Sequence, residues 1–163
     1  MLDIEFDRTI DTGLPAAELW TLIKQAFENP AESVIWPVEL EEVNPVELRC
    51  GAIVEATYKI GPLRARPSYR ITEFERGHSF SYESTADHPL QGGATVEVEP
   101  MEPRGSTLRW HGSYRPRLHP LAPGAVAFVR LYFLRTFFAH LASRLRTYEK
   151  TFYSTGGTGE ERL

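Results

Sequence analysis

The 163-residue sequence predicts an α+β domain in which a seven-stranded, curved antiparallel sheet packs around a long C-terminal helix, with two short helices between the first and second strands. Three observations predict this fold. Apolar and acidic residues alternate near the N-terminus, short alternating segments separated by turn residues follow, and a helical stripe of apolar residues lies near the C-terminus. Because a long sheet twists and curls, we expect its concave side to close around the terminal helix.

The N-terminal part of the chain contributes one strand and the two short helices. From Leu2 to Ile10, apolar residues alternate with acidic and polar ones, which is the period-two pattern of a half-buried strand. Pro15 stands where the first turn of a helix tolerates proline, and we expect that helix to continue to Glu28, where Asn29-Pro30 ends it. A second short helix is predicted over Ala31–Ile35.

Six further strands are predicted in the middle of the chain, each a short alternating segment bounded by glycine, proline or asparagine. Their expected ranges are Val38–Val43, Ala52–Ile60, Ala65–Glu75, Ser79–Ser84, Ala94–Pro100 and Thr107–Arg115. The pattern is that of an antiparallel meander. The sequence leaves open whether the loop from Thr85 to Gly93 opens as a lid.

The terminal helix is predicted over Pro123–Phe152. Its apolar residues recur in steps of three and four, which places them on one helical face: Leu131, Leu134, Phe138, Leu141, Leu145, Tyr148 and Phe152. Thirty residues at roughly 1.5 Å each span about 45 Å, enough to cross a small domain. We therefore expect one domain over residues 1–153 and a disordered tail over Ser154–Leu163, which is rich in Gly, Thr and Glu.

Composition excludes several classes of function. The net charge of −4 does not suggest nucleic-acid binding, and the single cysteine, Cys50, allows no internal disulfide and suits a reducing compartment. The N-terminus lacks the pattern of a signal peptide. The most apolar run, Phe128–Phe138, is interrupted by Arg130 and Arg135 and is too short to span a membrane. A cytoplasmic location without stable membrane insertion is expected.

Several stretches resemble the START-like superfamily, also called SRPBCC, which includes polyketide cyclases and lipid-transfer domains with a helix-grip fold. The resemblance covers nearly all of residues 1–153 and rests on the order and spacing of short motifs rather than on any one of them. They are Leu14-Pro15-Ala16-Ala17-Glu18-Leu19-Trp20, Trp36-Pro37, Arg49-Cys50-Gly51, Tyr69-Arg70-Ile71-Thr72-Glu73-Phe74-Glu75 and Gly105-Ser106-Thr107-Leu108. It implies an elongated cavity between sheet and helix. The family shares a fold more than a chemistry.

Strand alternation and helical spacing predict which side chains line that cavity: Tyr58, Tyr69, Tyr82, Trp110, Tyr114, Arg130, Leu134, Phe137, Phe138 and Leu141. The tyrosines could orient a ligand's carbonyl or hydroxyl, or their rings could simply pack. Small residues at Ala56, Ala65, Ala94 and Gly112 indicate either unfilled volume or sharp bends of the sheet.

The first half of the terminal helix has two further features. Arg130 lies beside the apolar stripe, which an anionic ligand would explain about as well as a side chain that reaches out to water. Phe128, Val129 and Tyr132 are expected to face outward. An apolar outer face of this kind is covered either by a second copy, giving a homodimer, or by the segment Pro116–Leu121.

The sequence assigns no catalytic residue, no metal and no cofactor. The histidines, at positions 78, 88, 111, 119 and 140, lack metal-site spacing, and no P-loop, GxGxxG or GxSxG is present. Three functions are compatible with these observations: binding or carriage of a small hydrophobic molecule such as a lipid, isoprenoid or polyketide-like aromatic; a cyclase or aromatase type of enzyme; and a protein-interaction module with a filled core. We favour the first, because it requires only the cavity.

Overall fold

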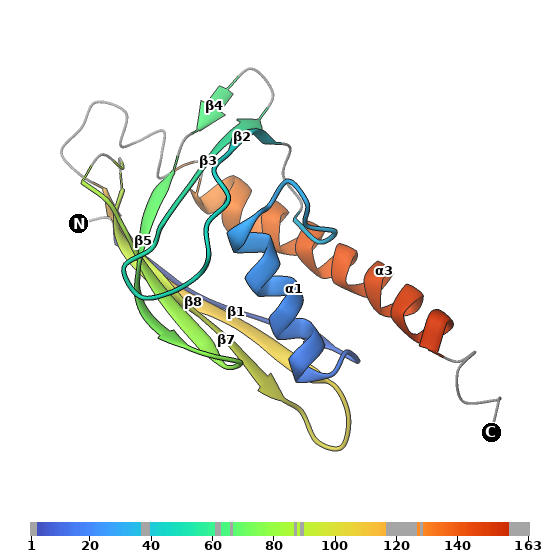
Figure 1. Cartoon of the computed structure of the whole chain (residues 1–163). Coiled ribbons are helices and arrows are strands. Elements are labelled where there is room, and N and C mark those ends of the chain that lie inside the picture. The colour runs from blue at the N-terminus through green and yellow to red at the C-terminus, as the bar shows by residue number, and fades with distance from the viewer. Residues whose placement is uncertain are drawn as a thin grey trace, which may run out of the picture.

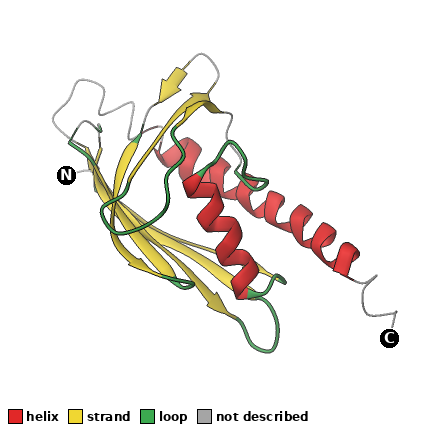
Figure 2. Ribbon diagram, in the orientation of Figure 1, coloured by secondary structure: helices red, strands yellow, loops and turns green. Residues whose placement is uncertain are grey.

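The computed structural model describes residues 3–36, 40–60, 63–65, 67–86, 88, 90–116, 127 and 129–156, and for residues 40–43, 58–60, 63–65, 116, 129, 133 and 156 it describes the backbone only. A curved antiparallel sheet forms one layer, and the helices lie on its concave side (Figures 1 and 2). The predicted α+β class, with a curved sheet and a C-terminal helix, is therefore confirmed. Among the described residues, no helix is both long enough and apolar enough to cross a membrane.

Within the described residues the sheet has eight strands instead of the predicted seven. They are β1 (Ile4–Thr12), β2 (Leu40–Val43), β3 (Ile53–Ile60), β4 (Leu63–Ala65), β5 (Ser68–Glu75), β6 (Ser79–Ser84), β7 (Leu90–Pro100) and β8 (Ser106–Pro116). Their order is β1-β8-β7-β6-β5-β3-β2, and β4 pairs only with β3. Since β7 begins at Leu90, the connection from β6 is shorter than the loop from Thr85 to Gly93 that the sequence indicated.

The additional strand arises because one predicted strand is interrupted. β3 pairs with β5 through Ile53↔Arg70 and with β4 through Tyr58↔Ala65, so both pairings keep one hairpin register. Pro67 lies in the gap between the two pairings, and proline has no backbone N–H to donate to a ladder. The same pairing register with β3 therefore applies before and after Pro67, while the backbone hydrogen bonds between the strands are interrupted there.

The predicted second short helix at residues 31–35 is wrong: α1 (Ala16–Glu28) is followed by turns and bends. The Ser33 hydroxyl accepts hydrogen bonds from the backbone N–H groups of Ile35 and Trp36, at 3.2 and 3.1 Å. A serine that bonds nearby backbone in this way competes with a helical turn. α1 buries one face, including Leu19, Ile23 and Phe27, on the sheet, where it contacts β7 and β8.

The C-terminal helix starts as the π-helix η1 (Val129–Phe137) and continues as α3 (Phe138–Gly156). α3 includes residues 154–156, which the sequence assigned to a disordered tail; residues 157–163 lie outside the described part. Phe137, Phe138, Leu141 and Leu145 are buried as expected, but Leu131 is 64% exposed. In a π-helix the backbone hydrogen bonds join residues i and i+5, so each turn holds more residues than an α-helical turn. Extending the α-helical spacing from α3 back into η1 therefore places Leu131 on the wrong face.

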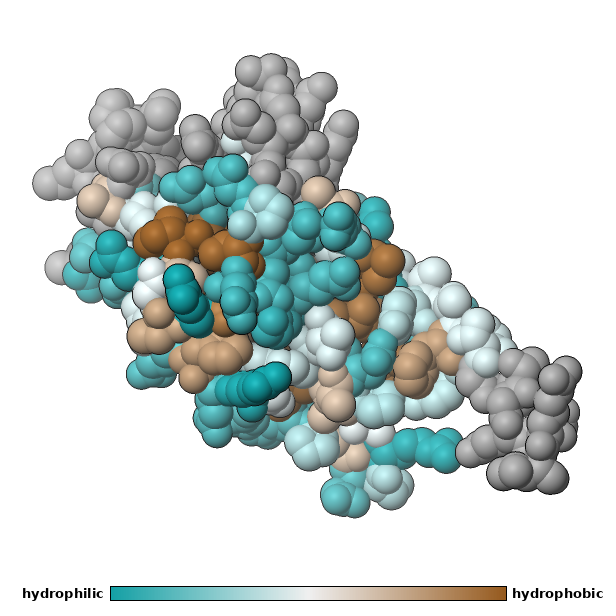
Figure 3. All heavy atoms as spheres, in the orientation of Figure 1, coloured by the Kyte–Doolittle hydropathy of each residue, from teal (hydrophilic) through white to brown (hydrophobic). Residues whose placement is uncertain are grey.

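Among the residues whose side chains are described, few large hydrophobic ones reach the surface. Those that do lie on different elements: Val34, Ile53, Met101, Leu131 and Tyr153. On the face shown in Figure 3, hydrophobic residues accordingly form separate patches among hydrophilic ones. Scattered exposure of this kind is normal for a folded domain and marks no interface by itself.

Candidate functional site

The polar centre of the concave face is a pair of buried tyrosines. Tyr82 on β6 and Tyr114 on β8 join their hydroxyl oxygens at 3.1 Å, and the indole N–H of Trp110 donates to the Tyr82 oxygen at 3.0 Å. Both tyrosines reach across β7, which carries only Ala94 opposite Tyr82 and Gly92 opposite Tyr114. Because these two residues are small, the phenol rings can meet above the middle strand.

Tyr69 on β5 extends this pair toward the edge of the concave face. Its ring centroid lies 4.8 Å from that of Tyr82, and its hydroxyl hydrogen-bonds with Tyr114. The ring of His88, in the connection between β6 and β7, lies 5.2 Å from the Tyr69 ring. We call Tyr69, Tyr82, Trp110 and Tyr114 the phenol cluster.

Burial keeps the inner phenols protonated. Desolvation raises the pKa of Tyr82 to about 12, although hydrogen bonds from Tyr114 and Trp110 act in the opposite direction. Desolvation also raises the pKa of Tyr114 well above its usual value, and the neighbouring hydroxyls of Tyr82 and Tyr69 raise it further. At neutral pH both side chains are therefore hydrogen-bond donors as well as acceptors.

The donors of the phenol cluster outnumber its internal hydrogen bonds. Three phenols and one indole carry four N–H or O–H donors. The bonds from Trp110 to Tyr82, between Tyr82 and Tyr114, and between Tyr114 and Tyr69 use three of them. Because the indole can only donate, the donor that these three bonds do not use is a phenol hydroxyl.

Aromatic rings surround the phenol cluster. Phe6 on β1 stacks on Tyr114 at 5.7 Å, and Phe27 on α1 lies 5.3 Å from Trp110. From the C-terminal helix, Phe137 and Phe138 approach Trp110 edge-on at 5.7 and 5.2 Å. A polar cluster in such a setting is strengthened by the low local dielectric, and each of its polar groups is costly to leave unpaired.

The structure thus brings together six of the ten residues that the sequence placed in the cavity: Tyr69, Tyr82, Trp110, Tyr114, Phe137 and Phe138. Leu141 is buried in the same core, and Leu134 is half-buried. Arg130 is exposed, so the side chain reaches water. The side chain of Tyr58 lies outside the described part, although its backbone is in β3.

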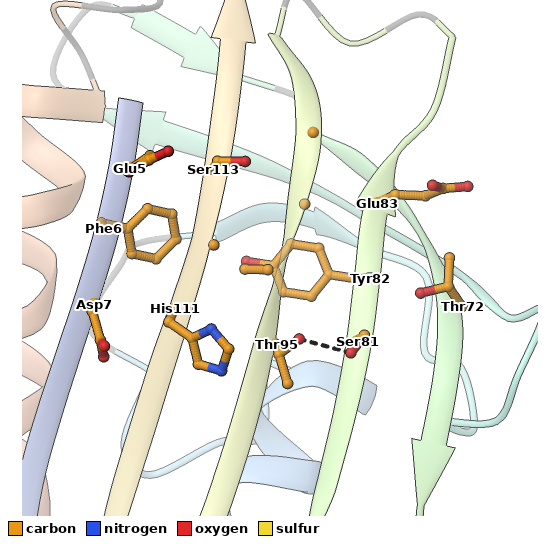
Figure 4. Close-up of a pocket in the computed structure, with 14 residues that line it drawn as sticks. Glu5, Phe6, Asp7, Thr72, Ser81, Tyr82, Glu83, Thr95, His111 and Ser113 are labelled. Atoms are coloured by element: carbon orange, nitrogen blue, oxygen red, sulfur yellow. Dashed lines mark hydrogen bonds between the residues drawn. The ribbon is translucent and has the colours of Figure 1, made fainter. Parts of the chain in front are cut away.

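A hollow among the described residues lies on the other side of the sheet. It is an open trough of about 760 Å³ across β1, β8, β7, β6 and β5. Polar side chains line it, as Figure 4 shows: Glu5, Asp7, Thr72, Ser81, Glu83, Thr95, His111 and Ser113. Carboxylates and hydroxyls give such a trough no affinity for an apolar molecule, so it does not suit the ligand that the sequence suggested.

Two glycines at the trough lie too close to neighbouring backbone to carry a side chain. A Cβ at Gly112 would collide with the carbonyl oxygen of Gly93, and a Cβ at Gly93 would collide with the carbonyl oxygen of Tyr82. At Gly112 the small residue is explained by the close approach of the neighbouring strand and not by unfilled volume. At Ala94 the space is occupied by the two phenol rings that cross it.

Ion pairs link β1, and Asp3 just before it, to β8. Arg109 donates two hydrogen bonds to the Asp7 carboxylate, at 3.0 and 2.7 Å, and Arg115 does the same for Asp3. The hydrogen bond from Arg109 lowers the pKa of Asp7, and the one from Arg115 lowers that of Asp3. Among the described residues, no group of three or more His, Cys, Asp or Glu could hold a metal ion.

His88 is the residue that sequence reasoning missed. It precedes Pro89 in a connection, and no spacing links it to Tyr69. The link comes from the β5–β6 hairpin, in which Tyr69 pairs with Ser84 and the Thr85 N–H donates to the Ser68 carbonyl. A prediction of that hairpin register would have placed residue 88 near Tyr69.

A curved antiparallel sheet closed over one C-terminal helix, with a polar cluster inside the grip, defines the helix-grip class. Solved structures share this fold at low sequence identity. Norcoclaurine synthase from Thalictrum flavum, a point mutant in complex with a transition state analogue, superposes with a TM-score of 0.66 at 12% identity, covering 93% of this chain and 97% of that one. Protein Ms6760 from Mycobacterium smegmatis gives 0.62 at 17% identity, covering 93% and 92%. Ginseng major latex-like protein 151 from Panax ginseng gives 0.61 at 12% identity, covering 91% and 99%.

Residues 3–147 match the family model described as polyketide cyclase / dehydrase and lipid transport. The match covers most of the chain, which therefore belongs to this family, as the sequence motifs indicated. No curated protein matches the sequence significantly.

Proposed function

We propose that the chain binds a small hydrophobic molecule on the concave side of its sheet, against the C-terminal helix, and that the phenol cluster is the polar anchor for that molecule. The observation that carries the proposal is the hydrogen-bonded set Tyr69, Tyr82, Trp110 and Tyr114 enclosed by aromatic rings. Ligand sites typically combine mostly apolar walls with a few placed polar groups.

Membership of the family supports this proposal, since its description includes lipid transport. The ligand expected from the site is apolar over most of its surface and carries an oxygen that can accept a hydrogen bond. Lipids, isoprenoids and polyketide-like aromatics all meet this description. Arg130 is exposed to water, so its charge gives no reason to favour an anionic ligand.

The proposal is tested by native mass spectrometry after gentle purification, together with displacement of a fluorescent hydrophobic probe. We expect a retained or added apolar molecule to bind, and Tyr114→Phe to weaken binding of oxygen-bearing ligands about tenfold, the value of one hydrogen bond of roughly 1.4 kcal/mol. Tyr153→Phe is the matched control, because Tyr153 is 46% exposed on α3. Failure of wild-type protein to bind any apolar probe would contradict the proposal.

A second candidate is an enzyme of the cyclase or aromatase type, in which the pocket folds a reactive poly-carbonyl chain. The observation that favours it is the presence of His88, a group able to exchange protons near neutral pH, beside Tyr69. Turnover of a tetraketide mimic that is lost in Tyr69→Phe or Tyr114→Phe would identify this activity. Binding without turnover would leave the carrier function.

Assembly and location stay predictions. Leu131 is 64% exposed on η1 and Tyr132 is half-buried, whereas the side chains of Phe128 and Val129 lie outside the described part. A homodimer through this face is tested by light scattering at high protein concentration, where a strictly monomeric mass would exclude it. A cytoplasmic location and the lack of nucleic-acid binding are likewise still predictions.

A further inference from the structure

We propose that His88 is a proton-transfer residue of this site, and that the molecules on which it acts are hydrophobic ketones with an acidic C–H next to the carbonyl. The inference rests on the proposed ligand site and adds to it a residue, a ligand class and an activity. Four observations carry it. They are the hydrogen bonds that hold the His88 ring, its contact with the Tyr69 ring, the greater exposure of His88 and Tyr69 than of Tyr82 and Tyr114, and the hydroxyl donors of the inner tyrosines.

The connection holds the His88 ring in either protonation state. Its Nδ1 lies 3.0 Å from both the backbone nitrogen and the carbonyl oxygen of Leu90. When Nδ1 carries a proton it donates to that carbonyl, and when it does not it accepts from that N–H. In the tautomer with its proton on Nδ1, the bond to the carbonyl leaves Nε2 as the basic atom, and the ring can then gain or lose a proton at Nε2 without having to turn.

The residues that fix this geometry are themselves held in place. Leu90 is only 3% exposed and starts β7, and the His88 N–H donates to the Thr85 carbonyl at 3.1 Å. Acid–base groups work best on such a rigid support, because a small displacement from the reacting atom costs a large part of the rate.

His88 lies where the buried phenol cluster meets the surface. Its ring packs at 5.2 Å against Tyr69, whose hydroxyl bonds with Tyr114. Tyr82 and Tyr114 are 5% and 3% exposed, whereas His88 and Tyr69 are partly exposed. His88 can thus exchange protons with water, while the inner phenols present fixed hydrogen-bond donors to a molecule that lies against Tyr69.

This arrangement fits reversible enolisation. A carbonyl oxygen that accepts a hydrogen bond from the Tyr69 or Tyr114 hydroxyl makes the neighbouring C–H more acidic. His88 Nε2 takes that proton, the C–H electron pair becomes the C=C bond, and the carbonyl electrons move to the oxygen, which the phenol stabilises. The imidazolium exchanges its proton with solvent and returns one to carbon. Every proton is accounted for, and no oxidant, reductant or cofactor is required.

The test uses 2-tetralone, an apolar bicyclic ketone with exchangeable protons next to its carbonyl. Its binding is measured by calorimetry, and loss of its α-proton NMR signals in D2O measures enolisation. In His88→Asn, one amide atom occupies the position of Nδ1 and can keep one of the two contacts to Leu90, either by accepting from its N–H or by donating to its carbonyl, while Nε2 is lost. We expect the exchange rate to fall about 100-fold or more and the dissociation constant to change less than about threefold.

His78→Asn is the matched control. Its Nδ1 also contacts a backbone carbonyl, that of Val98 at 3.2 Å, but it follows the turn at the other end of β6. We expect it to exchange 2-tetralone at the wild-type rate. A second variant, His88→Ala, should lose exchange and regain it when free imidazole is added, which a purely structural role of His88 would not produce.

The outcomes separate the two proposals. Equal exchange rates for wild type and His88→Asn, or binding of 2-tetralone without exchange above the buffer rate, would overturn the role of His88 and leave the ligand site intact. If neither 2-tetralone nor the fluorescent hydrophobic probe binds, the ligand site fails and His88 fails with it.

Discussion

The two faces of strands β6, β7 and β8 carry polar groups under opposite conditions. On the concave face, Tyr82 and Tyr114 are buried and joined to each other in an aromatic surrounding. On the outer face, the residues next to them in sequence, Ser81 and Ser113, line an open trough (Figure 4). The same strands position the two tyrosines and the two serines, so the two pairs of hydroxyls differ mainly in their access to water.

The comparison shows on which face of the sheet the loss of a hydrogen bond is costly. In the outer trough, the hydroxyl oxygens of Ser81 and Thr95 lie 2.8 Å apart and share a hydrogen bond. If this bond is lost, water can replace it at little cost in free energy. For the buried hydroxyls of Tyr82 and Tyr114, water cannot replace a lost hydrogen bond. Removing a partner, or binding a ligand that leaves one of these hydroxyls unpaired, is therefore costly in free energy. Substitutions of neighbouring residues on opposite faces therefore test the account directly.

The largest effect is expected for the neighbouring pair Phe80 and Ser81. Phe80 is fully buried, with Phe27 at 4.8 Å, so Phe80→Ala should lower the free energy of unfolding by about 3–5 kcal/mol. Ser81→Ala should lower it by less than about 1 kcal/mol. Urea denaturation measures both values, and similar losses would mean that the two faces are not distinct.

The next effect is a loss of stability at alkaline pH. Because the pKa of Tyr82 rises from 10 in the unfolded chain to about 12 in the folded one, folded protein binds more protons between these values. Its contribution is complete below pH 10 and is lost as the pH rises toward 12, amounting to roughly 2 to 3 kcal/mol. Urea midpoints between pH 9 and 12 should fall less steeply for Tyr82→Phe than for wild type. Equal slopes would show that Tyr82 titrates normally.

A smaller effect is expected for Tyr114 and its neighbour Ser113. Tyr114→Phe removes a hydroxyl to which Tyr82 is bonded, and we expect about 1–2 kcal/mol less stability by urea denaturation. Ser113→Ala, on the exposed outer face, should change stability by less than about 0.5 kcal/mol. If Ser113→Ala were the more damaging change, the assignment of inner and outer faces would be wrong.

Regular patterns made the coarse fold, and the inward position of several residues expected in the cavity, predictable from the sequence. Period-two alternation assigned Tyr82, Trp110 and Tyr114 to one face, because side chains on a strand alternate strictly. It could not predict that Tyr82 and Tyr114 meet across β7, since that contact depends on strand order and on the small size of Ala94.

The predictions from sequence were wrong where local hydrogen bonding interrupts the regular spacing of a helix or a strand. Ser33 bonds the backbone that a second helix would need, and the π-helix moves Leu131 out of the buried stripe. Pro67 interrupts a ladder whose register continues past it. The position of His88 beside Tyr69 depends on a hairpin register that no single-residue pattern encodes.

The central claim is that a hydrophobic ligand binds on the concave face, anchored by the phenol cluster. A crystal structure of the protein with 2-tetralone bound tests it most directly. We predict that the bicyclic ring lies between β5–β8 and the C-terminal helix, with its ketone oxygen within hydrogen-bonding distance of the Tyr69 or Tyr114 hydroxyl. Density for the ketone in the outer trough, with the phenol cluster unchanged, would contradict the account.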